Sequence, residues 1–200
     1  MADRIGLCGF GQLGWLRTVH RGLGAEDTGA GRSRLVLLRR SFGAPVEDVW
    51  EAVTDPVRLE RWFYPVSGDL RLGGKYQLVG NAGGEIRTCD RPNLLVVTWE
   101  YDGGGSSDLE VRLTAEGDGE ESTLVGLRHT AVLPFDDDFW LANLGRFAPG
   151  WDHGFCRLDA YLRGELAGDD LPDELSIEVQ RLWELAGAEW VAVGAAWREG

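Results

Sequence analysis

The sequence predicts an α+β domain in which a curved antiparallel sheet of about seven strands wraps a long C-terminal helix, with two short helices after the first strand. A β-prone run at residues 35–38 precedes the two short helical patterns. Six strand-like segments separated by turn signals follow, and a longer helical pattern begins at Pro149. A chain of 200 residues with 44% hydrophobic content can bury one core, and its length favours one domain with extensions.

Two short helices are predicted directly after the first strand. Pro45 suits the first turn of a helix, and apolar residues follow at i, i+3, i+4 and i+7, namely Val46, Val49, Trp50 and Val53. Asp55 precedes Pro56 and therefore avoids helical angles, which ends this helix. Residues 57–63 restart as the second helix.

The central segments alternate between apolar and polar residues, as expected for strands with one dry face and one wet face. The predicted strands span residues 69–71, 74–79, 84–89, 94–101, 109–114 and 123–132. In the last of them Val125, Leu127 and His129 share the dry face, while Arg128 points outward. The spacing of the strands indicates an antiparallel meander.

The long helix carries one apolar stripe that is expected to face the sheet. Residues 136–138 are three aspartates that cap a shorter helical stretch before it. The stripe recurs at spacings of four, three, four and four, at Trp151, Phe155, Leu158, Leu162 and Leu166.

Residues 1–33 are predicted to be a flexible leader, because eight glycines without a sustained period bury little. Residues 9–14 spell GxGxxG, but no βαβ unit surrounds them, so we interpret the match to a dinucleotide-binding turn as accidental. Removal of the leader is expected to shift the melting temperature by a few degrees at most.

Residues 169–200 are predicted to form an acidic helical extension, outside a domain that spans residues 34–168. Between residues 168 and 200, eight acidic residues face two arginines. Apolar residues alternate at spacings of four and three, at Val179, Trp183, Ala186, Trp190, Val193 and Trp197. Gly187 and Gly194 weaken this helix. We expect its three tryptophans to pack on their own chain; the alternatives are a lid over a cavity or a homodimer contact through Trp183, Trp190 and Trp197.

The charge of the chain argues against two classes of partner. A formal net charge of -13 repels a phosphate backbone, so no nucleic acid is expected to bind. The same charge disfavours an anionic membrane surface, and no apolar run reaches the roughly 18 residues that a membrane span requires.

Cysteine and histidine spacing predicts neither a disulfide framework nor a metal site. Cys8, Cys89 and Cys156 lie far apart without a CxxC pair, which fits a reduced, cytoplasmic setting. The histidines lack HxxxH or HxE spacing. No metal and no other cofactor is therefore expected.

Five segments carry a resemblance to a known family: residues 44–56, 59–63, 68–76, 95–100 and 150–155. The chain resembles, over about residues 34–168, the activator of heat-shock ATPase homologue family of the SRPBCC superfamily, which also holds START lipid-transfer proteins, polyketide cyclases and pollen-allergen relatives. The resemblance implies a helix-grip fold with an apolar cavity between sheet and helix. That scaffold hosts carriers, cyclases, resistance proteins and chaperone regulators. A chaperone partner is not predicted, because the eukaryotic activators carry an additional N-terminal chaperone-binding domain and a 33-residue leader is too short to be one.

His129 is the first candidate site residue, because its position in the alternation places an imidazole in the cavity, where it could bind a ligand or move a proton. The alternative is a core histidine held by a neighbour. Aromatic residues are expected to line the same cavity, with polar handles that orient a ligand, although core packing explains them equally well: Trp62, Phe63, Tyr76, Trp99, Trp151 and Phe155.

Two further sites are weaker candidates. Asp152 and His153 are adjacent on a helix and point about a hundred degrees apart, so they cannot form a catalytic dyad, and His153 is expected to be exposed. Glu85 could be a general acid or base if it were buried.

The sequence therefore predicts a protein that binds a small hydrophobic molecule between sheet and helix. The alternatives are a cofactor-independent cyclase or lyase that uses His129, and a co-chaperone-like regulator of a heat-shock ATPase that acts through its outer surface.

Overall fold

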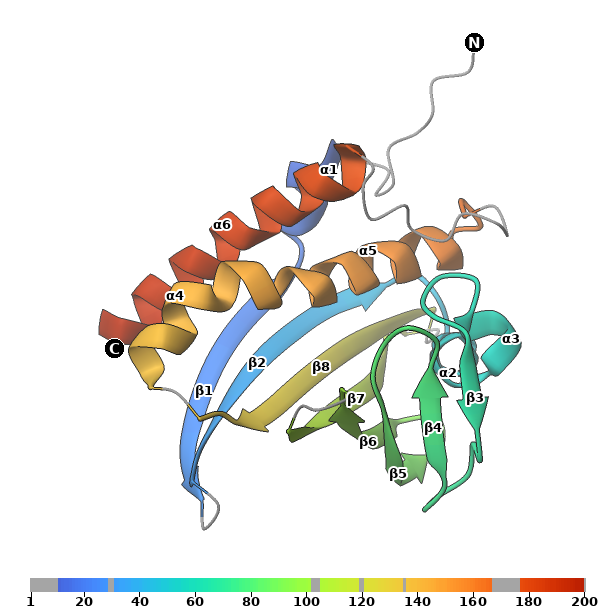
Figure 1. Ribbon diagram of the computed structural model, residues 1–200. Helices are drawn as coiled ribbons and strands as arrows, with labels where there is room; N and C mark the ends of the chain where they lie inside the picture. The colour runs from blue at the N-terminus through green and yellow to red at the C-terminus, as the bar shows by residue number, and fades with distance from the viewer. Residues whose placement is uncertain are drawn as a thin grey trace.

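Eight strands form one antiparallel sheet in the order β1-β2-β8-β7-β6-β5-β4-β3 (Figure 1). The computed structural model describes residues 11–28, 31–101, 105–118, 121–134, 136–166 and 177–199. The strands are β1 (His20–Thr28), β2 (Gly31–Phe42), β3 (Val66–Gly68), β4 (Lys75–Leu78), β5 (Gly83–Asp90), β6 (Leu94–Glu100), β7 (Ser106–Glu116) and β8 (Ser122–Val132). The helices are α1 (Gly11–Leu16), α2 (Val46–Thr54), α3 (Pro56–Leu59), α4 (Asp137–Phe147), α5 (Pro149–Leu162) and α6 (Ile177–Glu199).

The predicted α+β helix-grip architecture is confirmed. The sheet curls, and α4 and α5 run one after the other across its concave face (Figure 1). Both helices begin where the sequence favours it: Asp136 accepts the backbone N–H of Phe139 at 2.9 Å, and Pro149 occupies the first turn of α5. The short helices α2 and α3 close the end of the sheet near β3 (Figure 1).

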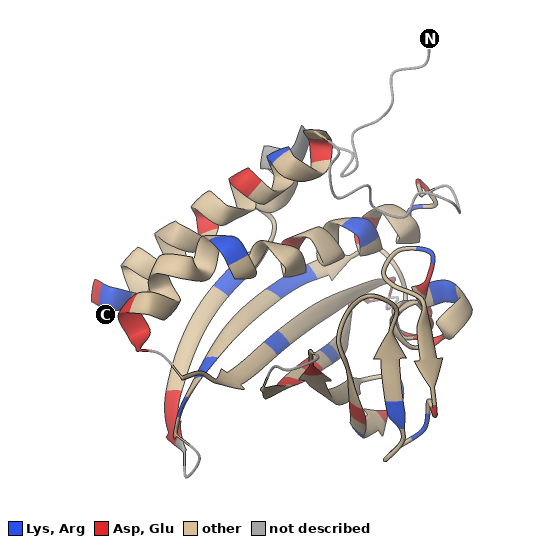
Figure 2. Cartoon of the chain, in the orientation of Figure 1, with Lys and Arg blue, Asp and Glu red and all other residues tan. Residues whose placement is uncertain are grey.

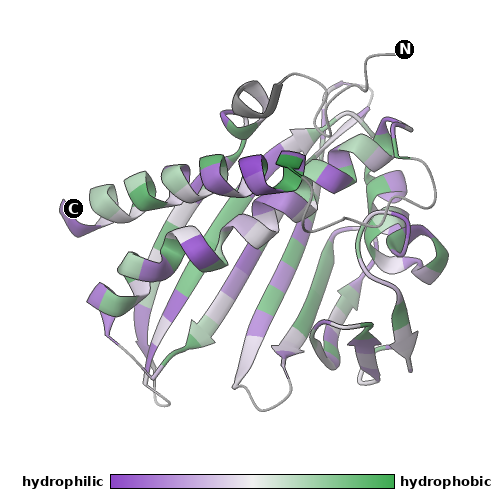
Figure 3. Cartoon of the chain, turned by 45° about the horizontal axis from the view of Figure 1, so that its top comes forward, coloured by the Kyte–Doolittle hydropathy of each residue, from purple (hydrophilic) through white to green (hydrophobic). Residues whose placement is uncertain are grey.

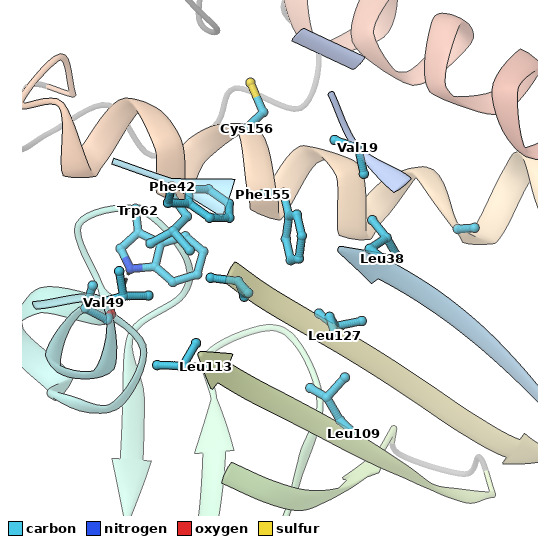
Figure 4. Close-up of a cluster of buried hydrophobic side chains, with 14 of the residues drawn as sticks. Val19, Leu38, Phe42, Val49, Trp62, Leu109, Leu113, Leu127, Phe155 and Cys156 are labelled. Carbon is cyan, nitrogen blue, oxygen red and sulfur yellow. Dashed lines mark hydrogen bonds between the residues drawn. The ribbon is translucent and has the colours of Figure 1, made fainter. Parts of the chain in front are cut away.

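The concave face of the sheet carries the apolar residues, as the alternation predicts. Hydrophobic and hydrophilic bands alternate along the strands in Figure 3. On β8, Val125 and Leu127 are buried, and His129 lies two residues further along the same face. Figure 4 shows Leu109 and Leu127 of the sheet beneath Phe155, which points from α5 toward them, while Cys156 points to the other side of that helix.

The predicted flexible leader is wrong for its described part, residues 11–28 and 31–33. Trp15, Leu16 and Val19 are buried in the main core. β1 pairs with β2 along its whole length and is the eighth strand, which the sequence analysis missed. Residues 1–10 lie outside the described residues, and so does the first part of the GxGxxG match.

The glycines that suggested flexibility belong to strand pairing. Gly22 lies opposite Leu37 and Gly24 lies opposite Leu35. A Cβ atom at Gly24 would lie 2.9 Å from a methyl carbon of Leu35, closer than side chains pack. Because glycine has no side chain, these positions of β1 leave room for the leucines of β2. Glycines at every second position thus stand where an apolar pattern would otherwise mark a strand.

Two buried aspartates on α5 bind the N-terminal segment. Asp152 is fully buried and forms an ion pair with Arg21 of β1, whose Nε lies 3.0 Å from Oδ1. Asp159, two turns later, accepts the indole N–H of Trp15 at 3.1 Å and Nη1 of Arg40 at 2.7 Å. The helix is thus buried on two sides, one against the sheet and one against α1, β1 and α6.

The C-terminal helix packs on its own chain, as the sequence analysis preferred. Trp190 is 0% exposed, and the ring of Trp197 meets that of Trp140 on α4 edge-on at 5.7 Å. Gly187 faces Gly145, and a Cβ atom added at Gly187 would lie 2.9 Å from the Gly145 carbonyl oxygen. The glycine that seemed to weaken the helix lies where the backbones of α6 and α4 come close together. A homodimer through the tryptophans stays a prediction, and of the three Trp183 is the most accessible, at 37% exposed.

Three details differ from the sequence analysis. β3 lies at residues 66–68 and not 69–71, and α5 ends at Leu162 because Gly164 adopts a positive φ of 71°. Cys89 is exposed and free, whereas Cys156 is disulfide-bonded, so the expectation of a chain without disulfides is wrong. Among the described helices none is long and apolar enough to cross a membrane.

Candidate ligand-binding cavity

Two adjoining cavities lie between the concave face of the sheet and the helices. The larger, of about 730 Å³, lies under α4, α5 and the start of α6, against the ends of β2 and β8. The smaller, of about 180 Å³, lies deeper, between α5 and strands β4 to β8. They share walls made by Trp62, Phe63, Trp99, Trp151 and Gly154.

All seven residues proposed from the sequence line these cavities. His129 lines only the larger one, while Tyr76 and Phe155 line only the smaller one. The other four stand in the shared walls. Glu85 is half-buried and belongs to neither lining.

His129 is held by hydrogen bonds at both ring nitrogens. The indole Nε1 of Trp151 lies 3.3 Å from Nδ1, and Ser107 Oγ lies 2.8 Å from Nε2. Because an indole N–H can only donate, Nδ1 accepts and the proton of the neutral ring is on Nε2. Ser107 accepts that proton and donates its own to the Trp99 carbonyl oxygen at 2.9 Å. The chain of donors and acceptors is complete.

Burial keeps this histidine neutral. It lowers the pKa of His129 to about 4, so the imidazole carries no charge at pH 7. The rings of His129, Trp99 and Trp151 pack against one another. The ring centroids of Trp99 and Trp151 lie 5.2 Å apart, and the centroid of His129 lies 5.4 Å from that of Trp151 and 6.2 Å from that of Trp99. Proton transfer to a ligand would require Trp151 to release Nδ1.

Most of the expected polar handles already have partners inside the protein. The Tyr76 hydroxyl donates to the Thr98 carbonyl oxygen at 2.7 Å, and burial raises the pKa of that phenol. The Trp62 indole donates to the Ala52 carbonyl oxygen at 2.9 Å, and the Trp151 indole donates to His129. These side chains therefore offer a ligand their apolar faces.

The backbone of this wall depends on one glycine. Gly84 of β5 has a φ of 157°, and a Cβ atom there would lie 2.1 Å from the Thr98 carbonyl oxygen. This close approach brings β5 against β6 and leaves the Thr98 oxygen within reach of Tyr76.

Several residues of the larger cavity were not predicted from the sequence, and the prediction that His153 is exposed is wrong. His153 lines the cavity because α6 covers this side of α5, and its ring lies 6.3 Å from that of Trp183. Burial, followed by the charge of Arg157, lowers its pKa to about 4. Its Nε2 atom is buried and has no hydrogen-bond partner.

Three arginines and two residues at the start of α6 also belong to this lining and were not predicted from the sequence. Arg34, Arg146 and Arg157 reach the larger cavity, as do Val179 and Trp183. Arg34 could have been found, since it lies two residues before Val36 on the concave face of β2. Val179 and Trp183 fit the idea that the C-terminal helix covers a cavity. Among the described residues, no group of three or more His, Cys, Asp or Glu side chains could hold a metal ion.

A family model described as Activator of Hsp90 ATPase homolog 1-like protein matches residues 43–163, more than half of the chain. The chain belongs to this family. The matched residues run from the end of β2 through α5, so they contain the sheet from β3 to β8 and most of both cavity linings. A search of curated proteins gives no match.

Solved structures extend the likeness beyond the family region. The crystal structure of CalU16 from Micromonospora echinospora is 34% identical, with a TM-score of 0.71, over 88% of this chain and 98% of that one. The solution structure of CalU16 is 35% identical, with a TM-score of 0.72, over 89% of this chain and 96% of that one. Because this coverage exceeds the family region, the likeness includes parts of the flanking segments.

Two other structures are more distant. DynU16, a protein in the dynemicin biosynthetic locus, is 26% identical with a TM-score of 0.57, over 66% of this chain and 48% of that one. PFC0360w, an HSP90 activator from Plasmodium falciparum, is 23% identical with a TM-score of 0.53, over 65% and 96%. The likeness to PFC0360w concerns the fold alone.

Proposed function

We propose that this protein binds a small, largely apolar, aromatic molecule in the larger cavity. The observation that carries the proposal is a hollow of about 730 Å³ walled by Trp62, Trp99 and Trp151, which also form part of the wall of a deeper apolar recess. Its volume is within the range of ligand pockets, and flat indole rings offer wide apolar contact to a planar guest.

The relatives support a ligand of the kind that biosynthetic pathways make. DynU16 belongs to a biosynthetic locus, and its likeness covers 66% of this chain. The likeness to the Plasmodium activator carries the fold alone, so it supports no chaperone partner for this chain.

Binding is favoured over acid–base catalysis by the state of His129. Both of its nitrogens are engaged and its pKa is lowered to about 4, so at neutral pH it is neither a ready proton donor nor an unoccupied base. The imidazole acts as part of the wall.

A fluorescence titration with N-phenyl-1-naphthylamine, an uncharged aromatic probe, tests the proposal. Ala131 lines the cavity, and the next residue, Val132, is exposed on β8. Ala131→Trp should fill the hollow and abolish binding, whereas Val132→Trp should leave it unchanged. Thermal unfolding of both variants establishes that they are folded. A folded Ala131→Trp protein that binds the probe like the unaltered chain would refute the proposal.

Native mass spectrometry of the freshly purified full chain gives an independent measurement. A retained small molecule that is lost in Ala131→Trp and kept in Val132→Trp would identify the natural ligand of this cavity.

A further inference from the structure

The larger cavity is basic although the protein is acidic. The chain has a formal net charge of -13, yet the described lining contains three arginines, Arg34, Arg146 and Arg157, and neither aspartate nor glutamate. In Figure 2 basic segments lie on β2 and β8 and on α4 and α5, while acidic segments lie at the lower end of β1, on α5 and along α6, which also has a basic segment near its C-terminal end. Because the chain has 33 acidic and 20 basic residues, a random set of its residues would contain more acidic than basic side chains.

Arg34, which lines this cavity, carries a buried donor without a partner. Its side chain is 4% exposed, and its Nε donates to Asp137 Oδ1 at 2.8 Å. Asp137 also binds Arg32, at 3.2 Å, and Arg32 pairs in addition with Asp27, at 3.3 Å, so Arg34 shares its one carboxylate with a second guanidinium group. The Nη1 atom of Arg34 is buried and has no hydrogen-bond partner. A buried, charged donor without an acceptor is costly, and an incoming acceptor would relieve that cost.

A second unused polar atom lies in the same cavity. Nε2 of His153 on α5 is buried without a partner, and the ring stands beside Trp183. The two residues that carry these atoms come from different elements, β2 and α5, and both line the cavity. A ligand in this cavity thus meets aromatic walls, one cationic donor and one further hydrogen-bonding nitrogen.

We infer that the ligand is an aromatic organic anion, with its carboxylate or equivalent anionic group on Nη1 of Arg34 and a hydroxyl or carbonyl group on Nε2 of His153. This inference rests on the proposed function, because it assigns the chemistry of the molecule in the same cavity. A guanidinium group suits such an acceptor, since it stays charged and presents its donors in one plane.

Two matched probes separate charge from shape. The fluorescent dye 8-anilinonaphthalene-1-sulfonate is the sulfonated form of N-phenyl-1-naphthylamine. The unaltered protein should bind the sulfonate about tenfold or more tightly than the neutral amine, the gain expected from one charge-assisted hydrogen bond. Against a net charge of -13, this preference would not arise from the overall field of the protein.

Arg34→Met and Arg32→Met are the matched variants. Both arginines bind Asp137, but only Arg34 lines the cavity. Arg34→Met should remove the preference for the sulfonate and leave the affinity for the neutral amine within about twofold, while Arg32→Met should change neither. His153→Leu should weaken the sulfonate less than Arg34→Met does.

The outcomes distinguish the two proposals. A protein that binds neither probe contradicts the proposed function. A protein that binds both equally tightly contradicts only the anion inference, and this result needs no variant, so it stands even if Arg34→Met fails to fold. If Arg34→Met keeps the preference for the sulfonate, or lowers the affinity for both probes equally, Nη1 of Arg34 does not bind an anion. Water or a rearranged side chain then satisfies this donor.

Discussion

The indole Nε1 of Trp190 on α6 donates to Oδ2 of Asp152 on α5 at 2.6 Å, and both side chains are 0% exposed. The other oxygen of this carboxylate pairs with Arg21 of β1. Burial raises the pKa of Asp152, an effect that Arg21 and Trp190 partly offset. One carboxylate therefore joins both flanking segments to the helix of the family domain.

The first prediction concerns α6. A chain truncated after Asp170 should stay folded but lose stability, because Trp190 is replaced by solvent and Asp152 loses one of its donors. Within the full chain, Trp190→Phe should lower the free energy of unfolding by about 1 to 3 kcal/mol, the cost of an unsatisfied buried acceptor. Trp183→Phe at the 37% exposed position is the control and should cost about 1 kcal/mol or less. Sedimentation should give the same association state for the full chain and the truncated chain, with masses that differ only by the removed residues. A dimer that is lost on truncation would contradict packing within the chain.

The second prediction replaces the expectation that the first 33 residues are dispensable. Arg21→Met should cost about 3 to 5 kcal/mol in chemical denaturation, because it leaves the buried carboxylate of Asp152 without its ion-pair partner. Arg71→Met, in a surface pair with Asp69, should cost about 1 kcal/mol or less. Deletion of residues 1–33 should be more damaging than Arg21→Met, since it also removes β1 and Trp15. A deleted chain with an unchanged melting temperature would contradict the structure of this segment.

The sequence predicted the sheet and the position of the cavity wall because both follow from simple periods. Alternation placed His129 on the concave face, and the spacing of Phe155 and Leu158 placed α5 over it. The same reasoning failed for His153, which was expected to be exposed because a polar residue on a helix normally faces water. A second stripe on α5, at Asp152, Cys156 and Asp159, repeats at spacings of four and three, and this was the available signal.

The flanking segments could not be predicted for a different reason. In β1 the glycines stand where a strand usually shows side chains, so no hydrophobic period appears. The hydrogen-bonding state of Arg34 and His153 depends on which distant elements meet, and no local pattern encodes it. Both limits arise because pairing partners, not the residues themselves, decide the outcome.

The third prediction concerns the contact between α4 and α6. Gly187→Ala should destabilise the protein although alanine favours a helix by about 1 kcal/mol over glycine, because the new Cβ would lie 2.9 Å from the Gly145 carbonyl oxygen, a backbone atom that cannot turn aside. Gly194→Ala is the matched change: its nearest neighbour, at 3.1 Å, is a methyl group of Leu144, which can move. Thermal unfolding should rank Gly187→Ala below Gly194→Ala, and the reverse order would mean that the helices are further apart.

The fourth prediction concerns pH. Burial lowers the folded-state pKa of His129 and of His153 to about 4, against an ordinary value of 6.5, so between pH 6.5 and pH 4 the unfolded chain binds more protons than the folded one. The stability that these neutral rings contribute is fully present above pH 6.5 and is lost as the pH falls toward 4. Between pH 7 and pH 5 each ring should account for about 2 kcal/mol of that loss. Other groups titrate in this range too, so the informative quantity is the difference between variants. His129→Gln and His153→Gln should each flatten the pH dependence of the unfolding free energy. His20→Gln, at an exposed position on β1, is the control and should not flatten it. Parallel curves for all four proteins would show that the two rings are solvated, and the closed hydrogen-bond chain around His129 would then have to be abandoned.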